Sequence, residues 1–238
     1  LFEPEDLLMI TGSPTRRRRY MDTIITQYSP HYSSTLHRYE RALLQRNKLL
    51  KQPGHTKDEL FAWNVALSRY GAEIILARQE LVDHLNEFIQ STYQTIAPTK
   101  DTVRLHYSRQ TPVSSQQLLH ELEHSYEKDH MVGATSVGPH RHDFEVLFND
   151  APANETGSRG ELRTITLALK FIEAALVAER TERQPIILLD DVFSELDSDR
   201  QHRLLSEFHK NQVIMTSVSS DSISSDMVHA SIREILIG

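Results

Sequence analysis

The chain has 238 residues, 39% of them hydrophobic and 25% charged, which is typical of a soluble globular protein with one large domain or two smaller ones. It has no cysteine, which excludes disulfides and thiolate metal sites, and no apolar stretch that approaches the roughly 20 residues of a membrane-spanning helix. Its net charge of −7 excludes a global basic field, so any contact with nucleic acid must come from local basic patches.

The first 22 residues contain helix signals and a run of arginines. The sequence begins at Leu1 rather than at methionine, from which we predict that a further segment precedes it. Pro4 suits a first helical turn, and Gly12-Ser13-Pro14 breaks the chain again. The run Arg16-Arg17-Arg18-Arg19 opposes the dipole of the helix that follows, which favours a nearby anion such as a phosphate backbone. The alternative is an ordinary solvated face at the start of a helix.

Residues 23–97 show a helical pattern with one clear break, at Gln52-Pro53-Gly54-His55. After the break, large apolar residues recur every seven positions, with Trp63, Tyr70 and Ala77 between them. The heptad positions are Leu60, Leu67, Ile74, Leu81 and Phe88. Such a repeat predicts two long helices packed antiparallel, which together form a helical hairpin arm. Packing is the favoured role for Trp63 and the tyrosines, with base stacking as the alternative.

Two alternating stretches, residues 102–107 and 144–148, predict half-buried strands, and residues 114–128 predict a helix between them. The loop Val137-Gly138-Pro139-His140-Arg141-His142-Asp143 precedes the second strand. Two imidazoles and a carboxylate at this spacing could ligate zinc. However, no second histidine cluster follows at a suitable spacing and thiolates are absent, so the sequence favours a loop without a metal.

A glycine-rich turn, Gly157-Ser158-Arg159-Gly160-Glu161, precedes a strongly apolar helix. Glycines let the backbone approach a ligand closely, and the free N–H groups at a helix amino terminus attract an anion such as phosphate. The simpler alternative is a plain helix entry in which Ser158 is the cap. Taken alone, the turn favours this simpler alternative, because short glycine motifs are common.

The strongest signal is the apolar run of residues 186–189, which ends in Asp190-Asp191. Such a run predicts a strand buried on both faces of a parallel sheet, with ligands bound at its carboxyl end. Two adjacent acids there need a positive partner, and Mg²⁺ on a nucleotide phosphate is the usual one. The alternative is that the acids end the strand and cap the next helix. A second buried strand, residues 213–217, ends in Thr216-Ser217 and reaches the same edge if the two strands are parallel.

The order of these motifs resembles an ABC-type ATPase of the SMC-like branch. In detail the chain is similar to the RecF family of bacterial DNA replication and repair proteins, over the carboxyl-terminal two thirds of that family's length. The most specific runs are Gln45-Arg46-Asn47 and Leu188-Leu189-Asp190-Asp191-Val192-Phe193-Ser194-Glu195-Leu196-Asp197. The implied fold class is α/β, a partial ABC-type ATPase head (residues 1–22 and 98–238) with an inserted antiparallel helical hairpin arm (residues 23–97).

The resemblance implies roles for two acids. Asp190 would hold Mg²⁺ through water. Asp191 would be the catalytic acid, and because it is shorter than the glutamate common in ABC enzymes, slow hydrolysis is implied.

Further residues are implied to contact ATP. Ser158, Gly160 and Glu161 belong to the signature motif, which touches the γ-phosphate bound by the opposite subunit. The remaining implied contacts are Asp197 at the dimer interface, Thr216 or Ser217 at the switch position, and Glu5 in a loop equivalent to the Q-loop.

The chain also departs from the family pattern. It has no Gly-x-x-x-x-Gly-Lys-Ser/Thr loop, so the half of the site that cradles phosphate would lie upstream of Leu1, and these 238 residues alone would be inactive. His142 stands where an aspartate is expected, which leaves any acid role to Asp143. Glu161 stands where the superfamily usually has glutamine.

The function implied by the resemblance is that of a recombination mediator. An ATP- and Mg²⁺-dependent homodimer would form a clamp on duplex and gapped DNA and act with RecR and RecO, in the cytoplasm at the nucleoid and without a membrane. Its DNA contacts would be to phosphates, with Arg16, Arg17, Arg18 and Arg19 as candidates. The alternatives are another SMC-like or ABC ATPase, and a truncated interaction module that does not hydrolyse ATP.

Overall fold

A computed structural model describes residues 1–109, 113–190, 203 and 211–216 of the chain. These residues belong to two compact units. Unit 1 contains Leu1–Gly12, Leu85–Arg104 and Val146–Gly238, and unit 2 contains Ser13–His84 and Leu105–Glu145. The predicted division into head and arm, with the arm at residues 23–97, stays a prediction. The two units have other boundaries, and unit 2 combines Ser13–His84 with Leu105–Glu145.

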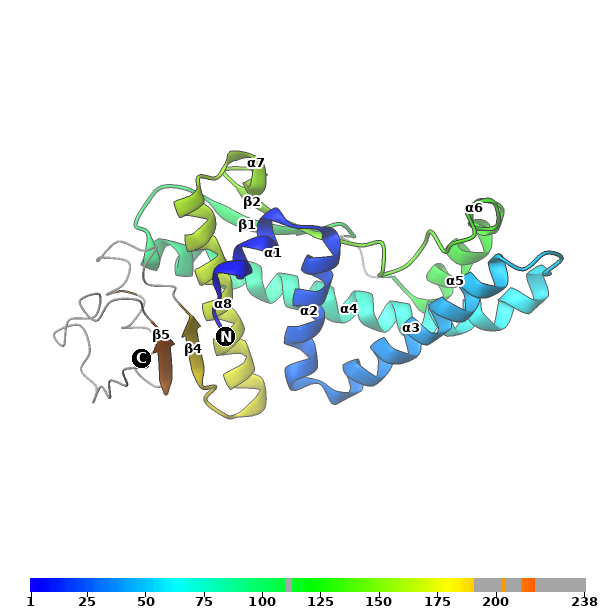
Figure 1. Ribbon diagram of the computed structural model, residues 1–238, viewed down its shortest axis with the longest axis horizontal. Helices are drawn as coiled ribbons and strands as arrows, with labels where there is room; N and C mark the ends of the chain where they lie inside the picture. Colours follow the sequence, from blue (N-terminus) through cyan, green and yellow to red (C-terminus); the bar gives the residue numbers. More distant parts are fainter. Residues whose placement is uncertain (110–112, 191–202, 204–210, 217–238) are drawn as a thin grey trace, which may run out of the picture. The chain divides into compact units, whose positions relative to one another are not determined.

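Unit 1 contains a small parallel sheet. β4 (Ile187–Asp190) pairs in parallel with β5 (Val213–Thr216), and Figure 1 shows the two strands side by side. On the other edge of β4, Phe2 forms a parallel bridge to Leu189, with its N–H donating to Leu188 and its carbonyl accepting from Asp190. β4 is therefore the central strand of the described part of this sheet.

The longest helix that lies wholly in unit 1 is α8 (Arg159–Thr181), which buries an apolar face including Leu162, Ile165 and Leu169. It packs against the start of the chain, a 3-10 turn η1 (Pro4–Leu7) and α1 (Leu8–Thr11). Lys170 of α8 lies 3.3 Å from Asp6, and the rings of Phe2 and Phe171 meet edge to face at 6.0 Å. These contacts fix the segment around Phe2 beside β4.

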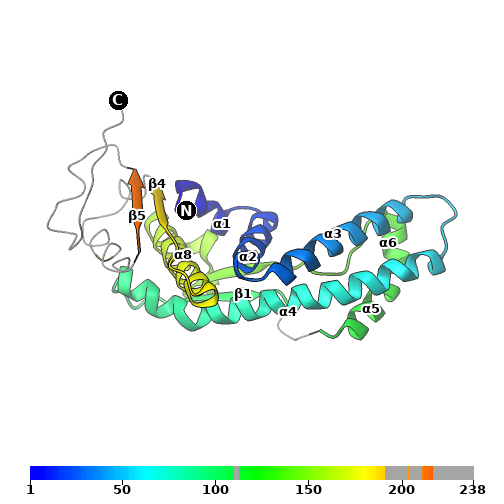
Figure 2. The same ribbon diagram turned by 90° about the horizontal axis from the view of Figure 1, so that it is seen from below.

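Unit 2 contains a helical hairpin. α2 (Pro14–Tyr28) and α3 (Pro30–Leu50) lead into α4 (Lys57–Ile96), whose residues up to His84 belong to this unit. Thr35 donates to Glu73, whereas Arg46, further along α3, donates to Asn64, which is earlier in α4. The two helices are therefore antiparallel, and Figure 2 shows them side by side.

The heptad pattern in α4 holds over three repeats and then fails. Leu60, Leu67, Ile74 and Leu81 are all buried, but Phe88 is 41% exposed, so its predicted place in the apolar row is wrong. An α-helix drifts by about 20° per heptad relative to a strict seven-residue repeat. The buried row accordingly moves to residues spaced by three or four positions, which are Leu85, Ile89, Tyr93 and Ile96.

The remaining elements largely follow the sequence prediction. The strands β1 (Val103–Tyr107), β2 (Phe144–Phe148) and β3 (Ala151–Pro152) form a sheet in that order, and β2 pairs antiparallel with β3. The helix predicted over residues 114–128 is two helices, α5 (Ser115–His124) and α6 (Tyr126–Val132), on either side of Ser125. Between β2 and α8 the chain forms β3 and the short α7 (Ala153–Thr156).

Within the described ranges, no helix combines the length and the apolar character that crossing a bilayer requires.

Candidate nucleotide site

Asp190 lies at the carboxyl end of β4, where the parallel sheet of unit 1 ends. Its partner across the ladder is Thr216, the last residue of β5, and the Thr216 hydroxyl donates a 2.6 Å hydrogen bond to Oδ1 of Asp190. The backbone N–H of Asp190 donates to Phe2 on the other side. The carboxylate is exposed, with Oδ2 not bonded to Thr216. An exposed carboxylate held in one orientation is a suitable oxygen ligand for a hard cation such as Mg²⁺.

The sheet around Asp190 differs in one respect from the prediction of a strand buried on both faces. Ile187 and Leu189 are buried, but Leu188 is 37% exposed and Ile214 of β5 is 52% exposed. Side chains alternate along a strand, so Ile187 and Leu189 lie on one face, which is buried, and Leu188 lies on the opposite face, which is partly exposed. The position of Asp190 at the strand end is unaffected, because it depends on the ladder rather than on the covering layer.

Ser158 and Glu161 meet at the amino terminus of α8. Ser158 Oγ accepts from the Glu161 N–H at 3.4 Å, and the Glu161 carboxylate accepts from the Ser158 N–H at 2.6 Å, which is a capping box. Gly160 lies within the first turn of the helix. Gly157 is required by packing, since a Cβ there would lie 2.7 Å from Leu162. In this structure the turn therefore stabilises the helix, because each of the two side chains accepts a hydrogen bond from the backbone N–H of the other residue.

Glu5 lies in η1, shortly after the bridge residue Phe2, and is exposed. Its neighbour Asp6 accepts from the Glu3 N–H and pairs with Lys170. Since Phe2 is bridged to Leu189, the start of η1 follows the same sheet edge as Asp190. Three of the predicted site residues, Asp190, Thr216 and Glu5, therefore belong to segments that the sheet brings to one edge. The predicted residues Asp191, Asp197 and Ser217 lie outside the described residues.

The four arginines predicted to contact DNA lie in the first turns of α2, in unit 2. Arg17 is largely buried and forms a bidentate pair with Asp143, at 2.8 and 2.7 Å. Arg18 donates to the His142 carbonyl and to the Thr15 hydroxyl. Arg16 and Arg19 are exposed. The run is thus divided between residues that support the fold and residues that face solvent.

The two histidines of the loop before β2 are bonded within unit 2. His140 lies 2.6 Å from the Tyr39 hydroxyl through Nδ1 and 3.0 Å from the Thr135 carbonyl through Nε2, which assigns the proton to Nε2. His142 Nδ1 lies 3.2 Å from the Tyr107 hydroxyl, and Asp143 pairs with Arg17. Each of the three side chains considered for zinc therefore has a partner in the protein.

These histidines make the stability of the protein depend on pH. Burial lowers the pKa of both His140 and His142 to about 4, whereas a histidine in an unfolded chain titrates near 6.5. Between these values the unfolded state binds more protons, so the free energy of unfolding is expected to fall as pH falls from about 6.5 to 4, by at most about 1.4 kcal/mol per pH unit for each ring. Urea unfolding at pH 7, 6 and 5 measures this. The His140→Gln variant is expected to show a shallower slope than wild type and the exposed control His37→Gln an unchanged one; equal slopes in all three would contradict the assignment.

Sequence and structure comparisons identify the relatives of this chain. It is 38% identical over 218 residues to the DNA replication and repair protein RecF of Lachnoclostridium phytofermentans, a match that covers 90% of this chain and 60% of that protein. It is 36% identical over 244 residues to RecF of Natranaerobius thermophilus, covering 95% and 63%. The chain belongs to the RecF family. No protein-family model matches it.

Solved RecF structures have the same fold. A structure of the recombination mediator protein RecF with ATP in the RecFOR pathway matches with a TM-score of 0.84 at 32% identity, covering 92% of this chain and 62% of that one. A second structure, of the RecF–ATPrS form, matches with a TM-score of 0.82 at 31% identity. The predicted fold class, an α/β ABC-type ATPase head with an antiparallel helical hairpin, is confirmed.

The chain spans about 60 to 65% of the length of the RecF proteins it matches. Family membership therefore establishes the fold of this part of a RecF protein. The activity, ligands and partners of a whole RecF protein, and the roles of individual site residues, are matters for a proposal.

Proposed function

We propose that the protein containing this chain is a RecF-like recombination mediator, in which ATP joins two copies into a clamp on duplex or gapped DNA and slow hydrolysis releases it. The observation that supports this most directly is the Asp190–Thr216 pair at the carboxyl edge of a parallel sheet, in a chain of the RecF family. Ligands of open α/β sheets bind at that edge.

Asp190 supplies the metal-binding carboxylate in this proposal. Mg²⁺ bound there through water would neutralise charge on the phosphates of ATP. The Thr216 hydroxyl keeps Oδ1 occupied, so Oδ2 is the oxygen available to a hydrated cation. Asp191, the next residue, is proposed as the acid that orients the attacking water, and its short side chain agrees with slow turnover.

The second half of the proposed site comes from another copy of the chain. Ser158, Gly160 and Glu161 at the amino terminus of α8 would approach the γ-phosphate bound by the partner, and Asp197 would lie at the same dimer interface. Ser217, at the switch position, and Glu5, at the sheet edge, are proposed to contact ATP as well. Backbone N–H groups at a helix start favour a phosphate. For a phosphate to bind the Ser158 N–H, the capping box has to rearrange, because the Glu161 carboxylate accepts a hydrogen bond from that N–H in this structure.

The proposed partners are duplex DNA, bound without sequence preference, and the proteins RecR and RecO, in the cytoplasm at the nucleoid. Of the arginines predicted to contact phosphate, Arg17 fits least well because Asp143 already pairs with it, whereas Arg16 and Arg19 are exposed and Arg18 donates to a carbonyl and a hydroxyl. Because these 238 residues contain no Gly-x-x-x-x-Gly-Lys-Ser/Thr loop, we propose that they do not hydrolyse ATP by themselves.

The test uses the complete protein and two substitutions. Asp190→Asn removes the charge that holds the metal and is expected to lower ATP turnover by about 10- to 100-fold, the range for groups that act on a metal through a bridging partner. Ser158→Arg places a bulky cation where the partner's phosphate would bind. This variant is expected to bind ATP but not to dimerise on ATP addition, as measured by light scattering.

The control is Asp150→Asn, which removes an exposed carboxylate of unit 1 that pairs with the exposed Arg104. It is expected to hydrolyse ATP and to dimerise like the wild type. Wild-type turnover in Asp190→Asn together with wild-type dimerisation in Ser158→Arg would show that the site is assigned to the wrong residues.

A further inference from the structure

Unit 2 contains a group of arginines and carboxylates around the loop of residues 135–143. Four carboxylates in this group each form an ion pair with a different arginine. The pairs are Arg17–Asp143 at 2.7 Å, Arg46–Asp129 at 2.7 Å, Arg78–Asp22 at 2.9 Å and Arg109–Glu121 at 2.7 Å. These four acids are thus already engaged.

Two arginines of the group are left with neutral partners. Arg18 donates to the His142 carbonyl at 3.1 Å and to the Thr15 hydroxyl at 3.0 Å. Arg141 donates through Nε and one terminal nitrogen to the Thr135 carbonyl, at 3.1 and 2.8 Å. Within the described ranges, no carboxylate is hydrogen-bonded to either guanidinium.

The charges of these two arginines act on each other. Desolvation lowers the pKa of Arg18, and the positive charges of Arg78 and Arg141 lower it further. Asp143 and Asp22 attract Arg18 from a distance, yet the direction of the shift remains downward. Arg18 also donates to the carbonyl of His142, the residue next to Arg141, so the two guanidinium groups lie at the same loop and repel each other.

The loop that carries Arg141 is held in place by buried groups. The Arg46 side chain is fully buried and donates to Asp129, Asn64 and Thr135 at 2.7 to 2.8 Å. Thr135 in turn donates its N–H and hydroxyl to Asn47, at 2.8 and 2.7 Å. The start of the loop is therefore fixed to α3 and α4.

The middle of the loop is fixed in the same way. Arg78, also buried, donates to the Pro139 carbonyl at 2.8 Å, and the Tyr39 hydroxyl bonds His140. Burying two arginines carries a desolvation cost, which their hydrogen bonds must offset. What results is a rigid loop whose Arg141 is exposed.

We propose that Arg18 and Arg141 bind a phosphodiester group of duplex DNA. A phosphate would supply the anionic oxygens that both guanidinium groups lack, and fixed donors lose little entropy when they bind. Arg141 uses only one face of its fork for Thr135, which leaves a terminal nitrogen available. The proposal rests on the proposed function, since it names where a RecF-like protein would hold the DNA backbone.

The test measures duplex DNA binding by the complete protein at several salt concentrations. Replacing both residues by glutamine, Arg18→Gln with Arg141→Gln, is expected to weaken binding at low salt by at least about tenfold. The slope of log affinity against log salt is expected to become shallower by about 1, because the variant makes one phosphate contact fewer and so releases about one counterion fewer when it binds. Arg41→Gln, which removes one exposed charge of α3, is the matched control and is expected to leave the slope unchanged.

The outcomes separate this proposal from the proposed function. Wild-type affinity and slope in the double variant, with normal ATP-dependent dimerisation, would overturn the phosphate site and leave the function intact. A loss of affinity for a fluorescent ATP analogue instead of DNA would also overturn it. Failure of the wild-type protein to bind duplex DNA would reject the function itself. If the double variant is less stable than the wild type, the same DNA-binding measurement on Arg141→Gln alone tests the proposal, because Arg141 lies at the surface.

Discussion

Replacement of Asp129 by alanine is expected to lower the free energy of unfolding by about 3 to 5 kcal/mol, the range measured when one partner of a buried ion pair is removed. Asp129 and Arg46 are both fully buried, with 2.7 Å between Oδ2 and the guanidinium nitrogen. Asp129 also accepts from Ser125 and from the Ser136 N–H. Without the carboxylate, Arg46 keeps a buried positive charge with no compensating anion. Urea denaturation monitored by circular dichroism measures the effect.

The matched control for Asp129 is again an ion pair of similar length in an exposed setting. Arg104 and Asp150 lie 2.9 Å apart, but their side chains are 61% and 75% exposed. Exposed pairs contribute about 0 to 1 kcal/mol, so Asp150→Asn is expected to be nearly neutral. Equal losses in the two variants would mean that burial of the Arg46 pair does not set its contribution.

Replacement of Gly138 by alanine is expected to lower the free energy of unfolding by about 2 to 6 kcal/mol. Gly138 has φ +128°, a conformation that side chains rarely adopt, and a Cβ there would overlap the Tyr39 hydroxyl that bonds His140. The backbone strain contributes about 1 to 3 kcal/mol and the overpacking a similar amount. Thermal unfolding of the variant against wild type measures the sum.

Gly54→Ala separates the two contributions. Gly54 also has a left-handed backbone, with φ +78°, but it lies in the turn between α3 and α4 and a Cβ there meets nothing within 4 Å. Only the backbone cost of about 1 to 2 kcal/mol is expected at this position. If Gly54→Ala were as costly as Gly138→Ala, the contact with Tyr39 would contribute nothing.

The positions of the helices and strands were largely predictable, because they follow from periodicity and breaks. The Pro53-Gly54 turn, the strand at Ile187 and the apolar helix after Gly160 are all confirmed. The break at Ser29-Pro30 was missed, although its signal is present: Ser29 caps α3 through the Tyr32 N–H and Pro30 starts the helix. Phe88 was misplaced because a strict heptad does not follow an undistorted helix over four repeats.

The candidate site was predictable where it depends on a strand end and not where it depends on side-chain partners. Asp190 and Thr216 are adjacent because parallel strands end together. By contrast, the sequence presents Arg17 and Arg18 as members of one basic run, and only the fold shows that Arg17 has a carboxylate while Arg18 has carbonyl and hydroxyl oxygens. Arg46 lies on an amphipathic helix, and the sequence predicts it at the surface because arginine is rarely fully buried.

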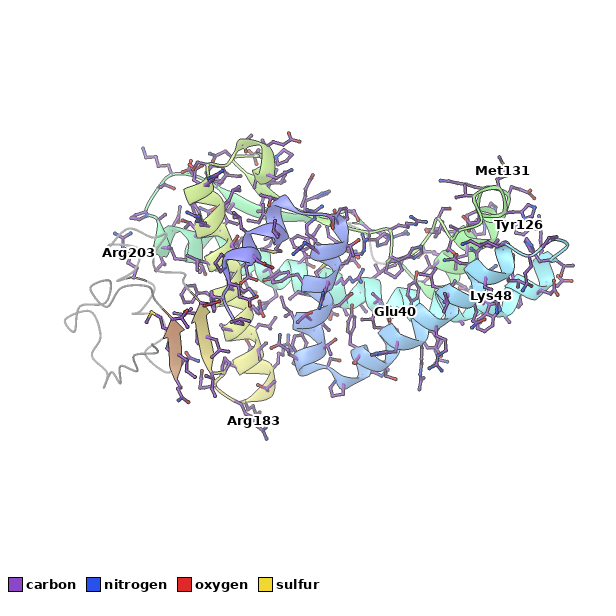
Figure 3. All side chains as sticks on the ribbon, viewed as in Figure 1. Glu40, Lys48, Tyr126, Met131, Arg183 and Arg203 are labelled. Atoms are coloured by element: carbon purple, nitrogen blue, oxygen red, sulfur yellow. The ribbon has the colours of Figure 1, made fainter. Side chains whose placement is uncertain are left out.

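At the hairpin end of unit 2, too, the side-chain partners could not be predicted from the sequence. Tyr126 of α6 stacks on His130 at 5.8 Å, and Lys57 of α4 lies 4.6 Å from the Tyr126 ring centre. Figure 3 labels Tyr126 and Met131 on α6 beside the ends of α3 and α4. Lys57 and Tyr126 are far apart in sequence, so no local pattern predicts this contact.

The environment of Arg46 has a consequence for how unit 2 forms during folding. Its hydrogen-bond partners Asn64, Leu122, Asp129 and Thr135 are separated from it by 18, 76, 83 and 89 residues. The α3–α4 hairpin is local and can assemble early, but at that stage the guanidinium is still hydrated. Water can leave it only when the distant segment that carries Asp129 arrives, so dehydration of one side chain and closure of a long loop occur in the same late, cooperative step.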